Sequence, residues 1–342
     1  MSDARSPKKI RNMEEFAQAS GISRPTVSKY FNDPESVKPV TRERIEKALK
    51  AFDYHPNMFA INLNRKRPKN IGIVVPHVAD PFYAEVVRQI EMRCLDAGYW
   101  AVILSSHGER ALEARAIQIL LSMKIAGAIV APLGFKSDLA LIDSLSANIP
   151  LVFLDSRVDG DGPFVGTDNV QSVSLMVDYL HRTGESPCFL ALPRVNRNAT
   201  ERSFAYVAAM ERLGLEPHLI DVPGEDWNFE EAGYRIALDM LDGGGFPSRT
   251  VMCANDRIAF GVIAAACRRG LRVGHGPDAD LRVAGHDDHP LSRFACPALT
   301  TVAQDFDGLA RRSVDQLLGM IEGGPAAGGG LLEARLVMRD SA

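Results

Sequence analysis

The segment NMEEFAQASGISRPTVSKYFN, residues 12–32, decides the fold of the first part of the chain. Asn12 is a favoured helix N-cap, and the glutamates that follow it suit the positive end of a helix dipole. Gly21 supplies the turn residue that ends this helix. Ser23 can cap a second helix, and Pro25 fits its first turn because the missing N–H has no helical partner there. The pattern therefore predicts a helix, a short glycine turn and a second helix.

A third helix is expected to begin at Thr41, which can cap a helix and is followed by Glu43 in the first turn. Val27 and Phe31 of the second helix stand four residues apart and can pack against it. The apolar residues of the third helix recur at helical spacing, and they are Ile45, Ala48, Leu49 and Phe52. Two helices joined by a short turn and supported by a third predict an all-α helix-turn-helix head over residues 1–55.

Charge is divided unevenly along the 342 residues. Residues 1–70 carry 15 Lys and Arg against 8 Asp and Glu, whereas the remainder carries 24 against 35. A basic head on an acidic body indicates that only the head has a polyanionic partner.

The segments 21–32 and 40–57 resemble the DNA-binding unit of the lactose-repressor (LacI/GalR) family, both in residue type and in spacing. The resemblance implies that the second helix enters the major groove of double-stranded DNA. It also implies a palindromic operator and a homodimer, because two half-sites need two heads.

By this resemblance, Arg24 and Lys29 face base edges or phosphates, and arginine is the side chain that best recognises guanine. Pro25 stands where relatives often carry a polar side chain, so it can give only an apolar contact. The remaining candidates in the head are polar residues that position the unit on phosphates or cap its helices. They are Asn12, Ser23, Thr26, Ser28 and Asn32.

Residues 56–69 connect the head to the rest of the chain and resemble the hinge helix of the same family. The match rests on Pro56, Asn57, Ala60 and Leu63. The resemblance implies a short helix that is unstable alone and folds on DNA, where two copies pack closely at Ala60. Each copy then inserts its leucine, here Leu63, between base pairs in the minor groove.

From Asn70 onward, apolar runs typical of buried parallel strands alternate with helical segments. This alternation predicts an α/β ligand-binding domain over residues 70–342, with a doubly wound parallel sheet in each of two lobes. We expect the first lobe to contain residues 70–163 and 304–322, and the second lobe to contain residues 164–303 and 325–342.

Polar and aromatic residues follow the expected strands, at the edge where open α/β sheets bind ligands. Carboxylates, amides and arginines can bond to hydroxyl groups, and aromatic rings pack against the C–H face of a sugar. The effector-binding candidates are Asp80, Phe82, Tyr83, Asp155, Arg157, Asn198, Arg202, Trp227, Asn255, Asp287 and Gln304. They predict a hydroxyl-rich ligand, most simply a sugar.

Residues 70–340 also resemble the ligand domains of the lactose-repressor family and of ribose-binding protein, which have the periplasmic-binding-protein-like fold. The resemblance implies that Trp227 stacks on a sugar and that five candidates contact it directly: Asp155, Arg202, Asn255, Asp287 and Gln304. Two simpler interpretations stay open, because Asn255 can merely cap the following helix and Trp227 can be rim packing.

Several features argue against other classes of protein. The five cysteines are an odd number without a close pair, which disfavours a disulfide framework. His286 and His289 have no third histidine or cysteine at ligand spacing, so we expect no metal and no cofactor. The first residues lack the apolar core of a signal peptide, and no apolar run suits a membrane span. We therefore expect a cytoplasmic protein that does not contact a membrane.

The sequence thus predicts a homodimeric transcriptional regulator, most simply a repressor, that binds an operator and responds to a small molecule. A purine or an amino acid is the alternative to a sugar as the effector. A solute-binding protein for sugar transport is disfavoured by the basic head and the missing signal peptide. An enzyme is disfavoured because no nucleophile, base and orienting residue form an evident set.

Overall fold

The computed structural model describes residues 10–57, 68–158, 162–224, 227–325 and 330–342. The chain divides into two compact units, Met1–Asn70 and Ile71–Ala342. Ala60 and Leu63 of the expected hinge helix lie outside the described residues, so their roles stay predictions.

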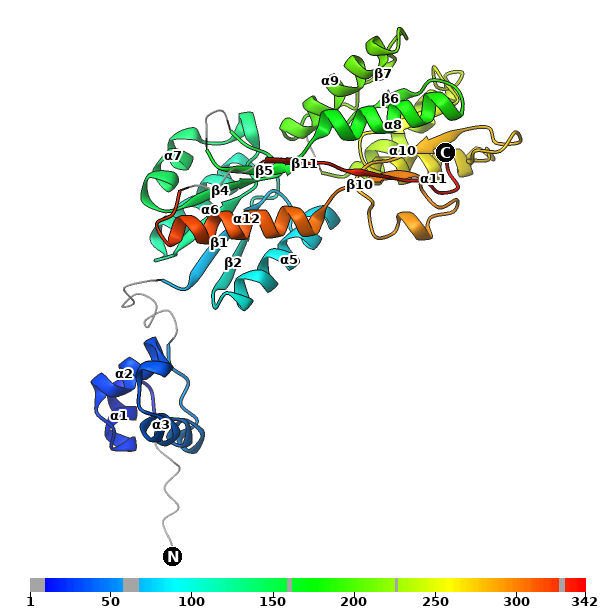
Figure 1. Ribbon diagram of the computed structural model, residues 1–342. Coiled ribbons are helices and arrows are strands. Elements are labelled where there is room, and N and C mark those ends of the chain that lie inside the picture. Colours follow the sequence, from blue (N-terminus) through cyan, green and yellow to red (C-terminus); the bar gives the residue numbers. More distant parts are fainter. Residues whose placement is uncertain (1–9, 58–67, 159–161, 225–226, 326–329) are drawn as a thin grey trace, which may run out of the picture. The chain divides into compact units, whose positions relative to one another are not determined.

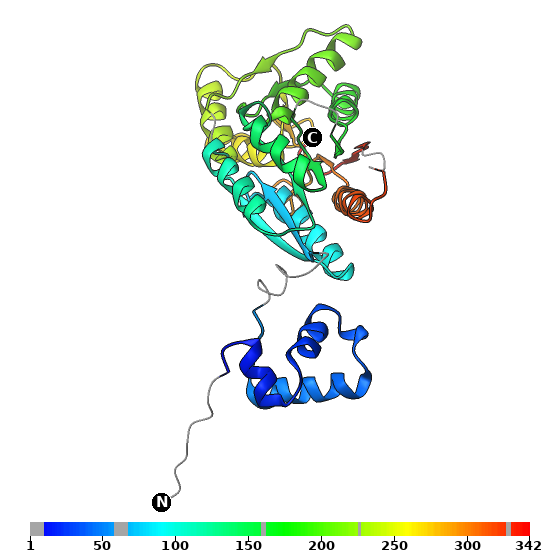
Figure 2. The ribbon, with the colours of Figure 1, turned by 90° about the vertical axis from the view of Figure 1, so that its left-hand side faces the viewer.

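The described part of the head is helical (blue in Figure 2). Asn12 caps the first helix, since its Oδ1 accepts a 2.9 Å hydrogen bond from the backbone N–H of Glu15. Gly21 ends that helix in the left-handed conformation, with φ of 63°. The elements are α1 (Met13–Ser20), α2 (Arg24–Asn32), the short 3-10 helix η1 (Pro34–Ser36) and α3 (Pro39–Phe52).

The structure differs from two expectations about the starts of these helices. The third helix, α3, begins at Pro39 and not at Thr41, because proline is already restricted to a helical φ and needs no N–H partner in a first turn. Ser23 occupies the N-cap position of α2 as predicted, but its hydroxyl lies 2.7 Å from the hydroxyl of Thr26 and makes no capping bond to a backbone N–H.

The core of the head forms around Phe16 of α1, Val27 of α2 and Ile45 of α3, which are all fully buried. Burying each such side chain stabilises the fold by about 1.5–3 kcal/mol. The ring of Tyr54 stacks on Phe16 with the centroids 4.8 Å apart. These contacts fix α2 so that Arg24 and Lys29 remain exposed.

The first lobe of the second unit is built on a six-stranded sheet in the order β11-β5-β4-β3-β1-β2 (Figure 1). The pairs β1–β3, β3–β4, β4–β5 and β5–β11 are parallel. The strands are β1 (Asn70–Val75), β2 (Trp100–Ser105), β3 (Gly127–Val130), β4 (Leu151–Leu154), β5 (Phe164–Thr167) and β11 (Gly330–Leu332).

Helices cover both faces of this sheet because its strands are apolar on both sides. One buried cluster joins the sheet to α5 (Pro81–Asp96) and α12 (Phe306–Ile321). A second cluster joins the opposite face to α6 (Arg110–Ser122) and α7 (Leu139–Asn148). A short 3-10 helix, η2 (Gly134–Lys136), precedes α7.

The second lobe has a parallel four-stranded sheet in the order β7-β6-β8-β9 and an antiparallel pair, β10–β12. Its strands are β6 (Cys188–Leu190), β7 (Leu219–Ile220), β8 (Thr250–Cys253), β9 (Arg282–Ala284), β10 (Thr301–Ala303) and β12 (Arg335–Val337). Its helices are α8 (Asn169–Thr183), α9 (Arg197–Arg212), α10 (Phe229–Asp242), α11 (Asp256–Arg268) and the 3-10 helix η3 (Ser292–Phe294).

The expected boundary between the lobes needs correction at two strands. Both β5 and β11 were expected in the second lobe, yet they pair with each other at the edge of the first lobe's sheet. The chain therefore crosses into the second lobe after Thr167 and not before Phe164. On its last passage it crosses after Leu332 and not between residues 322 and 325.

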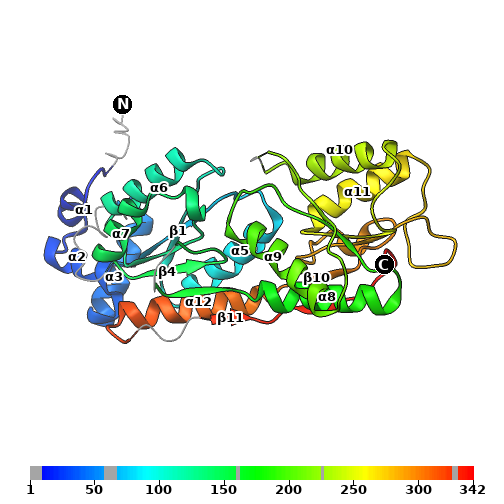
Figure 3. The same ribbon diagram turned by 90° about the horizontal axis from the view of Figure 1, so that it is seen from above.

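The crossing segments lie side by side between the lobes, and α8 and α12 flank them (Figure 3). The backbone N–H of Asp168 donates to the carbonyl of Leu332 over 2.9 Å. The hydroxyl of Thr167 is in turn hydrogen-bonded to Oε1 of Gln304. These bonds connect the three crossing segments, which contain Thr167, Gln304 and Leu332, to one another. Gln304 also lines the cleft between the lobes.

Candidate DNA-binding head and effector cleft

One face of α2 opens onto a groove of about 780 Å³ in the head. The groove also has walls from the beginning of α1 and from the segment after α3. Its described lining residues are Arg11, Asn12, Met13, Glu14, Arg24, Pro25, Ser28, Asn32, Tyr54, His55 and Asn57. Six of the residues predicted to bind DNA therefore lie around one surface, and three others, Ser23, Thr26 and Lys29, lie on or beside α2.

Polar contacts within the head already engage several of these side chains. Arg24 Nε lies 3.2 Å from Glu14 Oε2, and both side chains are more than half exposed. Asn32 donates over 2.9 Å to the backbone carbonyl of Ser28 on its own helix. An exposed ion pair such as Arg24–Glu14 is weak, so it holds the Arg24 side chain only loosely.

The second unit contains a small chamber between its lobes, which we call the inner chamber. Its volume is about 40 Å³, and its walls come from strand ends and helix starts of both lobes. It is lined by Asp80, Phe82, Tyr83, Asp155, Leu192, Val195, Asn196, Asn198, Arg202, Trp227, Phe229, Asn255, Asp287 and Gln304. Ten of the eleven effector-binding candidates are among them, so residues spread over more than 200 positions meet at one place.

Arg157 is the exception, since the structure places it outside the inner chamber. The side chain is exposed, and its guanidinium carbon lies 5.2 Å from the centre of the Phe164 ring. Asp155 adopts a positive φ of 63° directly after β4. The turn there leaves Asp155 buried at the chamber, while Arg157, two residues later, lies outside it.

Arg202 is the central cation of the inner chamber and is only 5% exposed. Its Nη2 lies 3.2 Å from Asp287 Oδ1, its Nη1 donates to the carbonyl of Ala254 over 2.7 Å, and its Nε donates to Asn169 Oδ1 over 3.0 Å. Gln304 Nε2 also donates to Asp287 over 2.7 Å. A buried guanidinium fixed by three acceptors is oriented in advance for a polar ligand.

Asp287 is the matching anion, and its charge is stabilised by its neighbours. Burial alone would raise the pKa of this carboxyl, but Arg202, His286 and Gln304 together hold the pKa below its ordinary value. Burial lowers the pKa of His286 to about 4, so its ring is neutral at pH 7. The neutral ring therefore donates from Nδ1 to Asp287 over 2.9 Å and accepts at Nε2 from Ser172 over 3.0 Å.

Asp155 stands on the first-lobe side of the chamber and differs from Asp287 in its protonation. Burial raises the pKa of its carboxyl to about 7, although the hydroxyl of Tyr83 donates to Oδ2 over 2.7 Å. Its backbone carbonyl accepts a 3.2 Å hydrogen bond from Asn198 Nδ2 in the second lobe. Asp155 is thus both a wall of the chamber and a point of contact between the lobes.

Asn255 caps the helix that follows it, which is the simpler of the two interpretations of this residue. Its Oδ1 accepts a 2.8 Å hydrogen bond from the backbone N–H of Ile258, which makes it the N-cap of α11. The residue is nevertheless buried and lines the inner chamber. Capping therefore fixes where the amide stands, and its remaining polar atoms stay a predicted contact for the effector.

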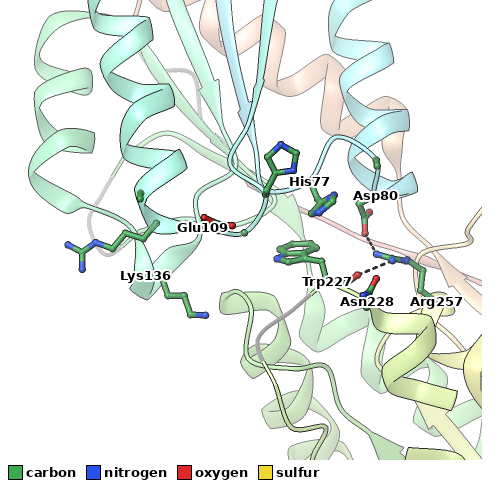
Figure 4. A pocket seen from close by; sticks show the side chains of 12 residues that line it. His77, Asp80, Glu109, Lys136, Trp227, Asn228 and Arg257 are labelled. Atoms are coloured by element: carbon green, nitrogen blue, oxygen red, sulfur yellow. Dashed lines mark hydrogen bonds and ion pairs between the residues drawn. The ribbon is translucent and has the colours of Figure 1, made fainter. Parts of the chain in front are cut away.

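Arg257 is a cleft residue that the sequence did not reveal. Its Nη1 donates to Asp80 Oδ2 over 2.9 Å, and Nη2 donates to the carbonyl of Trp227 over 2.9 Å (Figure 4). Nε and Nη2 also bond to the carboxylate of Glu230, both over 2.7 Å. Asp80 caps α5 through Phe82 N, so Arg257 joins the start of a first-lobe helix to the loop that carries Trp227.

A larger cavity, which we call the outer chamber, lies on the other side of Trp227 and measures about 730 Å³. Asp80 and Trp227 line both chambers. The residues around the outer chamber are His77, Ala79, Asp80, His107, Gly108, Glu109, Arg110, Ala111, Lys136, Trp227, Asn228 and Arg257 (Figure 4).

The described residues include no group of three or more His, Cys, Asp and Glu side chains placed to hold a metal ion. In the same part of the chain, no helix combines the length and the hydropathy that crossing a membrane requires.

Comparison with known proteins agrees with this division of the chain. Residues 12–57 match the family described as bacterial regulatory proteins, lacI family, and residues 177–342 match a periplasmic binding protein-like domain. The chain is 30% identical to the lactose operon repressor of Escherichia coli (strain K12) over 328 residues, which cover 95% of this chain and 89% of that repressor.

The chain belongs to the LacI family. It is therefore a DNA-binding transcriptional regulator with a helix-turn-helix head and a periplasmic-binding-protein-like ligand domain, as the sequence predicted.

Two further comparisons also cover nearly the whole length of both chains. The HTH-type transcriptional repressor CytR of Escherichia coli (strain K12) is 28% identical over 333 residues, which are 96% of this chain and 95% of CytR. The crystal structure of the Lac repressor dimer bound to operator and the anti-inducer ONPF matches with a TM-score of 0.83 and 28% identity. That match covers 98% of this chain and 99% of the Lac repressor chain.

Proposed function

We propose that this LacI-family chain is a homodimeric repressor whose affinity for a palindromic operator is set by a sugar-containing effector in the inner chamber. The proposal is carried by one observation: carboxylates, amides and an arginine from both lobes converge there beside aromatic rings. This chemistry suits hydroxyl groups, each of which donates and accepts a hydrogen bond. The protein would act on DNA in the cytoplasm.

The effector would act by changing how the two lobes contact each other. In the described cleft, the lobes are joined by the bond from Asn198 to the carbonyl of Asp155 and by the Arg257–Asp80 pair. A ligand that bonds to both walls stabilises one arrangement of the lobes more than another, which is the requirement for any ligand-driven shift. The first lobe begins at β1, directly after segment 56–69, so its movement would reach the hinge.

Operator recognition would depend on Arg24 and Lys29 of α2, with Pro25 adding only apolar contact. Polar side chains around the groove of the head would hold phosphates and fix the register of the helix. Two heads on one palindrome require a dimer. The similar Lac repressor was solved as an operator-bound dimer, which supports the same assembly for this chain.

A thermal-stability screen of the purified full chain against sugars, nucleobases and amino acids tests the proposed effector class. A ligand that binds only the folded state raises the unfolding midpoint by mass action. We expect a sugar-containing compound to raise the midpoint, Asn198→Ala to reduce this effect, and Arg157→Ala to leave it unchanged. Arg157 is a matched control because it is exposed outside both chambers. Stabilisation by a nucleobase or an amino acid alone would contradict the sugar assignment.

A further inference from the structure

The sizes of the two chambers differ greatly. The inner chamber, at about 40 Å³, has room for only one or two water molecules. The outer chamber, at about 730 Å³, falls within the range of roughly 300–1,000 Å³ that is usual for sites of small organic ligands. An effector that contacts the polar residues of the inner chamber would therefore have to place the rest of its atoms in the outer chamber, on the far side of Trp227.

The wall that faces this space is aromatic. The ring of His77 lies 6.0 Å from that of Trp227 at an angle of 32°, and His107 meets His77 edge to face at 5.4 Å. Burial lowers the pKa of His77, which favours the neutral imidazole at pH 7. Figure 4 shows the rings of His77 and Trp227 close together beside the chamber. Flat apolar faces of this kind bind planar rings by stacking.

The charges around the chamber are of both signs, so the lining is not the purely cationic site that a phosphate favours. Arg257 is held by the carboxylates of Asp80 and Glu230, so its charge is already balanced. Arg110 and Lys136 also line the chamber, and so does Glu109, which Figure 4 labels together with Lys136. A phosphate in the chamber would face the carboxylates of both Asp80 and Glu109, and like charges at close range repel.

Trp227 also packs against the first lobe at Gly108. A β-carbon added to Gly108 would stand 2.4 Å from Trp227 Nε1, so the indole packs directly against the Gly108 backbone. Gly108 has a positive φ of 73°, which a side chain would disfavour as well. The indole is thereby fixed between the two chambers, with residues of both around it.

We propose that the outer chamber is a second compartment of the effector site and binds a planar aromatic ring joined to the sugar. This inference rests on the proposed effector function and narrows it to a class of compound. The hydroxylated ring would occupy the inner, polar compartment after the lobes adjust, and the planar ring would stack in the outer one. Nucleosides and aryl glycosides share this chemistry.

Calorimetric titration of the full chain with matched pairs of compounds tests the inference. Adenosine and uridine are compared with methyl β-D-ribofuranoside, and 4-nitrophenyl β-D-glucoside and β-D-galactoside with their methyl glycosides. Stacking of one ring predicts that a ring-bearing member binds roughly 5- to 150-fold more tightly than its methyl partner. A preference within the ribosides identifies a nucleoside, and a preference within the hexosides identifies an aryl glycoside.

A variant that fills the outer chamber separates this effect from binding in the inner chamber. Ala111 lines the outer chamber and is exposed at the start of α6, so Ala111→Trp fills space without removing a polar contact. Ala147→Trp on α7 is the matched control, because Ala147 is exposed and lines neither chamber. We expect Ala111→Trp to abolish the preference for ring-bearing compounds and Ala147→Trp to keep it.

Equal affinity within every pair, or tighter binding of ribose 5-phosphate or glucose 6-phosphate than of any ring-bearing compound, would overturn the inference. If methyl glycosides bind and Asn198→Ala weakens them, the proposed effector function stands while the second compartment fails. If none of the compounds binds, the inference is overturned together with the sugar assignment.

Discussion

Arg257 of the second lobe and Asp80 of the first form an ion pair across the effector cleft, with Nη1 and Oδ2 2.9 Å apart. The two side chains are only 16% and 8% exposed. Asp80 caps α5, while Arg257 also holds the carbonyl of Trp227. One ion pair thus connects closure of the lobes to the position of the aromatic ring between the two chambers.

Asp80→Asn tests this connection, because the amide can still accept from Phe82 N but no longer pairs with Arg257. Removing one partner of a buried pair costs about 3–5 kcal/mol, and Arg257 keeps Glu230 here, so we expect a loss of about 1–3 kcal/mol. Urea unfolding of the full chain measures it. Asp242→Asn is the control, since it breaks the exposed Asp242–Arg269 pair and should change stability little. Equal effects of the two variants would contradict a stabilising role for the Asp80–Arg257 pair.

The pH dependence of stability tests the protonation of Asp155. Burial raises the pKa of its carboxyl from 3.8 to about 7. Between these values the folded chain binds a proton that the unfolded chain has released, so this group's contribution to the unfolding free energy falls as pH rises from about 4 to about 7. Asp155→Asn removes the titration. We expect the unfolding free energy of the variant, relative to that of the wild type, to rise by about 1–3 kcal/mol when the pH is raised from 5 to 8.

Urea unfolding at the two pH values measures this gain, and Asp143→Asn on the exposed face of α7 is the control. The difference in unfolding free energy between the wild type and Asp143→Asn should change much less between pH 5 and pH 8. A difference between wild type and Asp155→Asn that is the same at pH 5 and pH 8 would show that Asp155 is ionised throughout.

Glu14 gives a test of the DNA-binding surface that does not remove a proposed contact. Its carboxylate pairs with Arg24 at 3.2 Å and adds negative charge to the groove of the head. Glu14→Gln frees Arg24 and removes repulsion of phosphates, so we expect DNA affinity to rise roughly two- to fivefold. Glu43→Gln, on the exposed surface of α3, removes the same charge outside the groove lining. A similar gain from both variants would show a general effect of net charge.

The sequence allowed most of the cleft to be predicted because strand ends in a parallel sheet meet at one edge. Asp80, Asp155 and Asn255 each follow a buried apolar run, and that local pattern placed them correctly. Arg157 follows such a run as well, but it lies outside the inner chamber. Its position depends on the turn at Asp155, whose positive φ could not be predicted from the local sequence pattern.

Contacts between distant segments could not be predicted from local patterns. Arg257 lies 177 residues from Asp80, and its position inside the first turn of α11 looked like part of an ordinary helix start. The pairing of β5 with β11 joins segments that are far apart in the chain. Hydrophobic periodicity shows that a strand is buried, but it does not show which sheet the strand joins.

The most direct test of the central claim is the affinity of the full chain for a DNA fragment that it selects from a random pool, measured with and without the effector found by thermal screening. The account predicts a palindromic fragment bound at least about 1,000-fold more tightly than random DNA. Arg24→Ala should weaken this binding roughly 5- to 150-fold, and the control Arg44→Ala, on exposed α3, should weaken it much less. Saturating effector should change the affinity by a further 5- to 150-fold. Selection of no preferred sequence, or an operator affinity that the bound effector leaves unchanged, would contradict the account.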